Sequence, residues 1–254
     1  MYKAEKSSIY SLSKGYVIQQ KGNFILEKLQ PCYGVPQERK RVIIVGYKKE
    51  SGLHFSFPPE THTKYSEINL EGKRKQKWVT LREAIGDLPE PLPALVRNKT
   101  NGNISLPNHE YMMGTFSSIY MSRNRRKRWD QQSFTIQAGG RHAPLHPSSS
   151  EMIKVAEDLW KFRDTTNHIN HRRLSVRECA RIQTFPDDFI FYYQNLADAY
   201  KMIGNAVPVR LAEEIAQKIY SDLDYLRNPS ESMKMPTICE NKLVPKKECE
   251  RLTS

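Results

Sequence analysis

A run of apolar, mostly β-branched residues covers positions 42–47 and is the clearest strand signal in the chain. The run is too short for a buried helix, and it lacks the alternation expected of a strand with one solvated face. We therefore expect a strand that is covered on both faces, as in a parallel sheet. Before it, the pattern predicts a short helix that ends near Gly15, followed by extended segments at residues 16–18 and 24–26.

Three helices are predicted from their start signals. The spacing Ser/Thr-x-x-Glu at residues 80–83 and 175–178 is that of a capping box, in which two side chains satisfy the free N–H groups of a helix start. The first helix should stop near Gly86, and the second should end before Pro186. Pro208 suits the first turn of a third helix. Its apolar stripe consists of Val209, Ala212, Ile215, Ala216 and Ile219.

The segments between these elements suggest where the chain divides. Repeated prolines at residues 88–93 remove backbone donors and fix φ, so we expect a linker there. Residues 95–170 show weak periodicity and many polar residues, which indicates a small, irregular domain. Within it, residues 152–162 could be helix or strand, because periodicity alone does not decide. After Asp224 the chain is polar and aperiodic, and a mobile tail is expected.

The net charge narrows the classes of partner. The 254 residues carry a formal charge of +12, which favours a polyanion: nucleic acid first, and an anionic membrane surface second. The sequence contains no apolar run long enough to span a bilayer, and its first residues lack a signal-peptide core. We therefore expect a cytoplasmic protein. The alternative of a general basic RNA-binding protein would explain the positive charge but no other feature of the sequence.

Cysteine and histidine spacing predicts no metal site. The four cysteines (Cys32, Cys179, Cys239 and Cys249) have no short paired spacing, so neither a disulfide framework nor a zinc pattern is indicated. His142 and His146 have a spacing that could hold a metal. However, Pro144 lies between them and no Cys or carboxylate cluster accompanies them, so a loop with hydrogen-bonded histidines is the better interpretation.

Two arginines stand at the start of the predicted strand. Alternation along a strand would place Arg39 and Arg41 on the same face. A matched pair of guanidinium groups can bind a phosphate or polarise a base carbonyl. The alternative is a solvated basic turn before an ordinary buried strand.

Three blocks of residues resemble the DNA cytosine-5 methyltransferases, in the order of that family. They are residues 33–42 (YGVPQERKRV), 173–186 (RLSVRECARIQTFP) and 200–208 (YKMIGNAVP), and residues 79–89 are a weaker match. The resemblance covers roughly residues 15–220. It implies an α/β fold: the C-terminal part of a Rossmann-like methyltransferase sheet plus a small, irregular α+β target-recognition domain.

The resemblance also implies domain limits. Residues 1–90 would be the C-terminal strands of the catalytic domain, and residues 91–172 the target-recognition domain. Residues 173–222 would return to the catalytic and cofactor domain. Residues 223–254 would be the disordered tail.

By position in the family, Arg41 would contact the O2 atom of a flipped cytosine, while Arg39 and Gln37 would organise the pocket. A fixed guanidinium there stabilises the negative charge that develops when a nucleophile adds to the ring. Residues 204–207 would lie beside the cofactor, S-adenosyl-L-methionine, at a glycine-bearing turn that enters a helix. The residues concerned are Gly204, Asn205, Ala206 and Val207; for Asn205 the alternative is a helix cap without a ligand. Arg177 and Arg181 look structural.

In this family the segment between the blocks contacts duplex DNA. The basic run at residues 122–129 suits phosphates, and its candidates are Arg123, Arg125, Arg126 and Arg128. Thr135 and Ile136 match the threonine-plus-aliphatic pair of such domains. Gln137 and Arg141 are the candidate base readers, because Gln suits adenine and Arg suits guanine.

Other signatures of the family are missing. The chain contains no Gly-x-Gly cofactor loop, and its one Pro-Cys pair ends in Cys32, directly before the arginine block rather than well upstream. Residues 240–242 match the Glu-Asn-Val motif only in part. We therefore predict a split enzyme of a restriction-modification system, found in a bacterial cytoplasm and associated with the nucleoid through DNA. A separate N-terminal methyltransferase subunit would supply the nucleophilic cysteine, the acidic residue and the cofactor loop. The alternative is a non-catalytic DNA-binding remnant.

Overall fold

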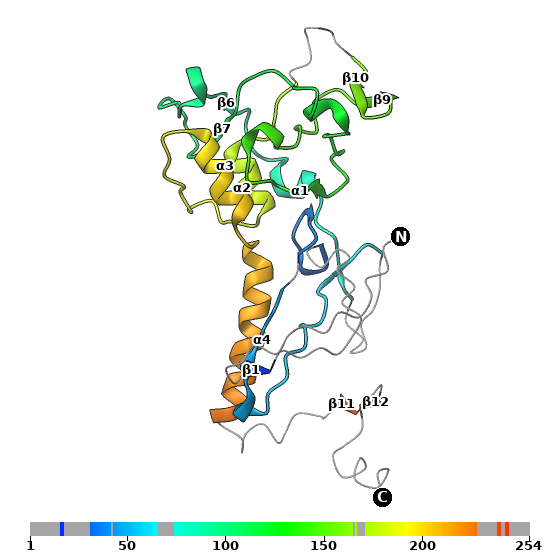
Figure 1. The fold of residues 1–254 in the computed structure, drawn as a ribbon, viewed down its shortest axis with the longest axis vertical. Coiled ribbons are helices and arrows are strands. Elements are labelled where there is room, and N and C mark those ends of the chain that lie inside the picture. Colours follow the sequence, from blue (N-terminus) through cyan, green and yellow to red (C-terminus); the bar gives the residue numbers. More distant parts are fainter. Residues whose placement is uncertain are drawn as a thin grey trace, which may run out of the picture. The chain divides into compact units, whose positions relative to one another are not determined.

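The computed structural model describes residues 31–41, 43–65, 74–164, 166 and 171–227, and the backbone of three short strands near the termini (Figure 1). The chain forms two compact units. The larger consists of Phe24–Val42 and Pro59–Glu214, and the smaller of Met1–Asn23, Ile43–Pro58 and Ile215–Ser254. The predicted helix before Gly15, the segment at residues 24–26 and the tail beyond Arg227 lie outside the described residues, apart from those strands.

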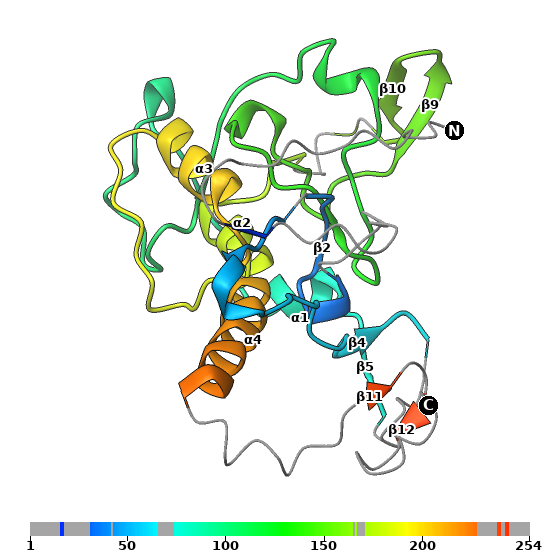
Figure 2. The ribbon, with the colours of Figure 1, turned by 60° about the horizontal axis from the view of Figure 1, so that its bottom comes forward.

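Short strands, four α-helices and several short 3-10 turns make up the regular structure of the described residues. The helices are α1 (Leu81–Ile85), α2 (Val176–Ile182), α3 (Leu196–Asn205) and α4 (Val209–Arg227). The described strands form two-stranded pairs only. Together with the helices they give a mixed content of helix and strand, which confirms the predicted α/β class. The parallel pairs are β2 (Gln37–Glu38) with β8 (Ser133–Phe134), β4 (His62–Thr63) with β5 (Gln76–Lys77), seen in Figure 2, and β6 (Leu92–Pro93) with β7 (Glu110–Tyr111). The antiparallel pairs are β1 (Tyr16–Val17) with β3 (Tyr47–Lys48), β9 (Met152–Ala156) with β10 (Leu159–Phe162), and β11 (Ile238–Cys239) with β12 (Lys242–Leu243).

Both predicted capping boxes are confirmed. The Thr80 side chain accepts from the backbone N–H of Glu83, and the Glu83 carboxylate accepts from the N–H of Thr80. Ser175 and Glu178 make the same reciprocal pair at the start of α2. Residues 152–162, left open between helix and strand, form the β9–β10 hairpin.

The buried strand predicted at residues 42–47 is wrong for this chain. Residues 43–46 have no regular structure, and Ile44 is 68% exposed; Val42 lies outside the described residues. Only Tyr47 and Lys48 are in a strand, β3, opposite β1. A strand forms only where its backbone N–H and C=O groups can bond to a neighbouring strand. In the described chain that neighbour is β1, which is two residues long.

Two helices differ from the prediction. The sequence patterns did not predict α3, which carries the 200–205 part of the third block. The third predicted helix exists as α4, but it continues to Arg227, past Asp224, where the polar pattern predicts a tail.

The main apolar core belongs to the larger unit. Helices α1, α2 and α3 lie side by side in it (Figures 1 and 2). Its buried side chains include Leu81, Ile85, Ile136, Leu174, Val176, Ile182, Leu196 and Ile203. Burial of these groups away from water is the main stabilising contribution of the unit.

Charged side chains are also buried in this unit, each with partners. Arg177 is fully buried and donates to the carbonyl oxygens of Pro107, Pro186 and Phe189. Arg181 is half-buried and pairs with Asp87 and Asp187. These contacts support the structural roles predicted for both arginines, because buried charges are tolerated only when they are paired or hydrogen-bonded.

His146 lies beside another buried charged pair, and it makes stability depend on pH. Burial lowers the pKa of His146 to about 4, although the nearby Glu178 carboxylate acts to raise it. In the unfolded chain the pKa of histidine is about 6.5. The unfolded state therefore binds a proton more readily, and the contribution of His146 to stability is complete above about pH 6.5 and is lost as the pH falls toward 4.

We therefore expect the free energy of unfolding in urea to fall by about 2 kcal/mol between pH 7 and pH 5 on account of this group. In His146→Gln this part of the pH dependence should disappear, while that of the other histidines remains. An unchanged pH profile in the variant would contradict the assignment.

Candidate functional site

Gln37 and Arg39, at β2, join segments that are far apart in the sequence. Arg39 donates to the carbonyl oxygens of Ile136 and Gly204, both at 2.8 Å. The Gln37 side-chain oxygen accepts from the N–H of Ile136 at 2.6 Å, and its amide donates to Gln183 at 3.2 Å. The first block, the predicted recognition segment and the two later blocks thus meet at one buried junction.

Gln183 completes this junction and was not predicted. It is fully buried at the end of α2, and its amide donates to the carbonyl oxygen of Ile203 at 3.1 Å. Its position inside the second block could have identified it from the sequence. Amide side chains suit such a position because each both donates and accepts.

Arg39 keeps its charge inside this junction. Burial, followed by repulsion from Arg41, lowers the pKa of Arg39 to about 10. The guanidinium therefore remains protonated at neutral pH. Its two bonds to carbonyl oxygens are charge-assisted, which makes them stronger than bonds between neutral groups.

Arg41 does not share a face with Arg39, so the predicted matched pair is wrong. Strand β2 ends at Glu38, and the alternation of a strand no longer applies at residues 39–41. Arg39 is 6% exposed, whereas Arg41 is exposed and donates to the carbonyl oxygen of Lys40 at 2.7 Å. The exposed guanidinium of Arg41 is accessible to a ligand, while that of Arg39 is committed to the fold.

Gly204 lies where two backbones touch. A Cβ atom at this position would be 2.4 Å from the backbone of Gln137 and from the N atom of Ala138. Only glycine permits this approach, and it holds α3 against the predicted recognition segment.

The connection at residues 206–208 leads into a helix, α4, as predicted, but Gly204 belongs to the preceding helix and not to the turn. Gly204 and Asn205 end α3, and α4 starts at Val209. The first N–H groups of α4 are already bonded, that of Val209 to Gln183 and that of Arg210 to Thr184. What remains available is the exposed side of the connection: Asn205, the half-buried Ala206 and Val207, which is 57% exposed.

The four arginines of the basic run have different environments. Arg125 is buried and donates to the carbonyl oxygens of Tyr120 and Ile119, with its guanidinium 4.9 Å from the Tyr120 ring centre. Arg126 is half-buried and donates to Pro147. Arg128 is exposed and pairs with Asp130, and Arg123 is exposed. The structure therefore favours a structural role for Arg125, contrary to the prediction that it contacts DNA.

A cavity of about 200 Å³ collects several predicted DNA-contacting residues. Arg123, Thr135 and Gln137 line it, with Arg125 in its wall. The sequence reasoning missed its other lining residues: Glu38, Asn124, Phe134, His142 and Pro144. Glu38 lies in the first block and Asn124 in the basic run, whose other members are predicted site residues. Their position beside those members could have identified both from the sequence. For His142 the sequence predicts only a hydrogen-bonded histidine in a loop.

Two of the predicted residues in this region do not line the cavity. Ile136 is fully buried, because its backbone is held by Gln37 and Arg39, so its side chain cannot meet DNA as predicted. Arg141 is exposed, in a short 3-10 turn.

His142 is neutral at neutral pH. Burial lowers its pKa, and the charges of Arg125, Arg123, Arg173 and Arg141 lower it further. Its Nδ1 atom is buried and has no hydrogen-bond partner within the described part of the chain. An unpaired buried ring nitrogen is uncommon in folded proteins and calls for a ligand or water.

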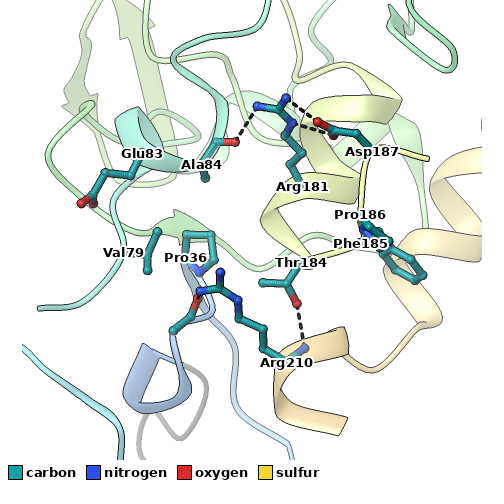
Figure 3. A pocket seen from close by; sticks show the side chains of 11 residues that line it. Pro36, Val79, Glu83, Ala84, Arg181, Thr184, Phe185, Pro186, Asp187 and Arg210 are labelled. Atoms are coloured by element: carbon teal, nitrogen blue, oxygen red, sulfur yellow. Dashed lines mark hydrogen bonds and ion pairs between the residues drawn. The ribbon is translucent and has the colours of Figure 1, made fainter. Parts of the chain in front are cut away.

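A second cavity, of about 390 Å³, lies between α1, the end of α2 and the start of α4 (Figure 3). Arg181 in its wall is neutralised by Asp87 and Asp187, and Arg210 donates to Gly34 at 3.4 Å. Of its lining residues none was predicted to bind a ligand. The cavity around Glu38 is therefore the better candidate site.

Cys32 cannot act as a nucleophile at neutral pH. Burial, followed by a hydrogen bond to the Glu60 carboxylate, raises the pKa of its thiol to about 12. A thiol of this kind is not ionised and is inert. This agrees with the prediction that its Pro-Cys pair is not the family's nucleophile.

Two features are absent from the described ranges. No helix there is long and apolar enough to cross a membrane. In the same ranges, no group of three or more His, Cys, Asp or Glu side chains is arranged to hold a metal ion.

Comparison with known proteins points to one family. The model of the family described as C-5 cytosine-specific DNA methylase matches residues 30–221. Type II methyltransferase M.MthTI of Methanothermobacter thermautotrophicus is 61% identical over 197 residues, which are 77% of this chain and 55% of that protein. M.NgoPII of Neisseria gonorrhoeae is 48% identical over 193 residues, 76% of this chain and 53% of that protein. The chain thus spans about half the length of the curated relatives it matches. Among solved structures, the Entamoeba histolytica methyltransferase EhMeth has a TM-score of 0.41 and 16% identity, covering 82% of this chain and 55% of that one.

Proposed function

The chain belongs to the C-5 cytosine-specific DNA methylase family, and on that premise we propose that it is the C-terminal subunit of a split DNA (cytosine-5-)-methyltransferase. The methyl donor of this family is S-adenosyl-L-methionine. The buried junction of Gln37, Arg39, Ile136 and Gly204 carries the proposal, because it joins the family's arginine block to both the recognition segment and the third block.

In this function Arg41 acts on the cytosine. Its guanidinium is exposed beside Arg39, which is fixed by two backbone carbonyls. Addition of a nucleophile to the ring builds negative charge on the base, and a fixed cation at the carbonyl oxygen stabilises that charge. The base must first leave the helix stack, which a positively charged pocket favours.

Recognition of duplex DNA belongs to the cavity and the exposed arginines around it. Arg123, Arg128 and Arg141 are exposed and can reach phosphates, while Thr135 and Gln137 face a cavity that a base edge can approach. Arg126 is half-buried and would contribute to DNA binding through the attraction of its positive charge to the phosphates.

The exposed connection between α3 and α4 fits one wall of the cofactor site. Asn205 offers a side-chain amide for hydrogen bonding, and Ala206 and Val207 offer an apolar surface. An amide beside small apolar groups suits a ligand with both polar and apolar parts. Bound S-adenosyl-L-methionine would supply the methyl group, and these residues would orient it.

The partner would be an N-terminal subunit that carries the nucleophilic cysteine, the acidic residue and the cofactor loop. The relatives are about twice the matched length, and this sequence contains no Gly-x-Gly. The smaller unit also exposes apolar side chains that a partner could cover: Ile44, Tyr220, Leu223, Tyr225 and Leu226.

Mixing this chain with the part of M.MthTI that it does not match should reconstitute methyl transfer. We expect transfer of labelled methyl from S-adenosyl-L-methionine to cytosine in duplex DNA by the mixture, and none by either piece alone. Arg41→Ala should lower the rate by about 100-fold or more, since one oxyanion-type contact is lost, while DNA affinity is largely kept.

Arg163→Ala is the matched control, because Arg163 is an exposed arginine paired with Glu151 on the surface and should leave the rate unchanged. Absence of transfer by the mixture would refute the split enzyme. Binding of DNA without transfer would instead support the non-catalytic remnant.

A further inference from the structure

The cavity beside β2 has one feature that a phosphate site lacks. Its lining residues include Glu38, which carries a carboxylate, beside basic and amide side chains. A site that only holds the DNA backbone presents donors and positive charge, and a carboxylate would repel the phosphate. The mixture of an acceptor with donors instead matches the edge of a base pair.

Glu38 is held firmly in the wall of this cavity. It pairs with Phe134 in the parallel β2–β8 ladder, and its carbonyl oxygen accepts from the Thr135 hydroxyl at 2.8 Å. Lys127 Nζ lies 3.3 Å from Oε2 of Glu38 and 4.5 Å from the Phe134 ring centre. A carboxylate has about four acceptor positions, so one ammonium orients the group and leaves acceptor capacity for a ligand.

We infer that Glu38 is a specificity-determining residue, which accepts a hydrogen bond from the exocyclic amino group of a cytosine in the recognised duplex. The inference rests on the proposed function. In the major groove, cytosine presents an amino donor, and its paired guanine presents only acceptors, N7 and O6. Glu38 therefore suits the cytosine of such a pair rather than its guanine.

His142 supplies an independent reason for a ligand at this place. Its buried Nδ1 atom has no partner within the described chain, and a buried polar atom left unpaired is costly. His142 lines the same cavity as Glu38 and Gln137. A base edge with both donors and acceptors can satisfy groups of both kinds, whereas a phosphate satisfies donors only.

The test is selection of bound duplexes from a randomised DNA pool with the full chain, its Glu38→Gln variant and Glu60→Gln. Glu60 is the matched control, because it also pairs with a lysine, Lys75, at 3.2 Å but lies outside the cavity. The wild type should select a C·G pair at one position. Glu38→Gln should weaken that preference by about tenfold, toward A·T, and keep the others; Glu60→Gln should match the wild type.

A second measurement changes the DNA instead, and its wild-type arm needs no variant. Replacing the selected cytosine by its analogue without the amino group should weaken wild-type binding by about tenfold and Glu38→Gln binding much less. An unchanged base preference in Glu38→Gln, a uniform gain in affinity, or selection of adenine by the wild type would overturn the role of Glu38 and leave the proposed function standing. Failure of the wild-type chain to bind any duplex would overturn both.

Discussion

Replacing Glu178 by alanine is expected to lower the free energy of unfolding by about 3 kcal/mol, because it removes the buried carboxylate of an ion pair. Arg172 would keep only the carboxylate of Glu90, which lies at 2.8 Å but is 64% exposed. Arg172 is 2% exposed and holds both Glu178 oxygens at 2.9 Å, and the N–H of Ser175 adds a bond of 2.7 Å. Although burial acts to raise the pKa of Glu178, Arg172 outweighs it and holds that pKa below its usual range. The loss also removes one half of the capping box of α2.

Urea unfolding at pH 7 measures this effect, and Glu151→Ala is its control. Glu151 pairs with Arg163 at 2.8 Å, but both side chains are more than half exposed. Exposed ion pairs contribute about 1 kcal/mol or less, so the control should unfold almost as the wild type does. Equal effects of the two substitutions would show that burial of the Arg172–Glu178 pair has no energetic consequence.

Replacing Gly204 by alanine is expected to destabilise the fold by about 3 kcal/mol. The added Cβ would stand 2.4 Å from the backbone of Gln137 and Ala138, and backbone atoms cannot rotate away as a flexible side chain can. Relief requires α3 to move from the recognition segment. Such movement would also lengthen the bond from Arg39 to the Gly204 carbonyl, which is now 2.8 Å.

Gly102→Ala is the control for this prediction, because a Cβ at Gly102 meets no atom within 4 Å and the residue has no positive φ. Its free energy of unfolding should stay within about 0.5 kcal/mol of the wild type. A stability for Gly204→Ala equal to that of Gly102→Ala would mean that the two backbones can separate without cost.

Local signals in the sequence predicted α1 and α2 well. Their capping boxes, at Thr80 and Ser175, act within four residues, so the chemistry that starts the helix is contained in the motif itself. The apolar run at residues 42–47 was misleading for the opposite reason. A strand depends on a neighbour elsewhere in the chain, and the described residues supply one for Tyr47 and Lys48 only.

The candidate site was predicted as a set of residues but not as an arrangement. Gln37 and Arg39 were expected to organise the pocket, and Thr135 to belong to the recognition segment. In the fold, hydrogen bonds join Gln37 and Arg39 to Ile136, and Thr135 to Glu38. The different exposures of Arg39 and Arg41 could not be predicted, because they depend on where β2 ends. The burial of Arg125 depends likewise on Tyr120 and Ile119 in three dimensions.

The sequence by itself determined the family, the basic charge, the starts of two helices and the absence of the Gly-x-Gly loop, since each is a matter of residue identity and short spacing. Only the tertiary structure decided that Arg39 is committed to backbone carbonyls while Arg41 is exposed, that Gly204 lies against Gln137, and that Glu38 shares a cavity with Arg123 and His142. Hydrogen bonding, close packing and burial act between segments separated by many residues. They are properties of the folded chain that local patterns do not encode.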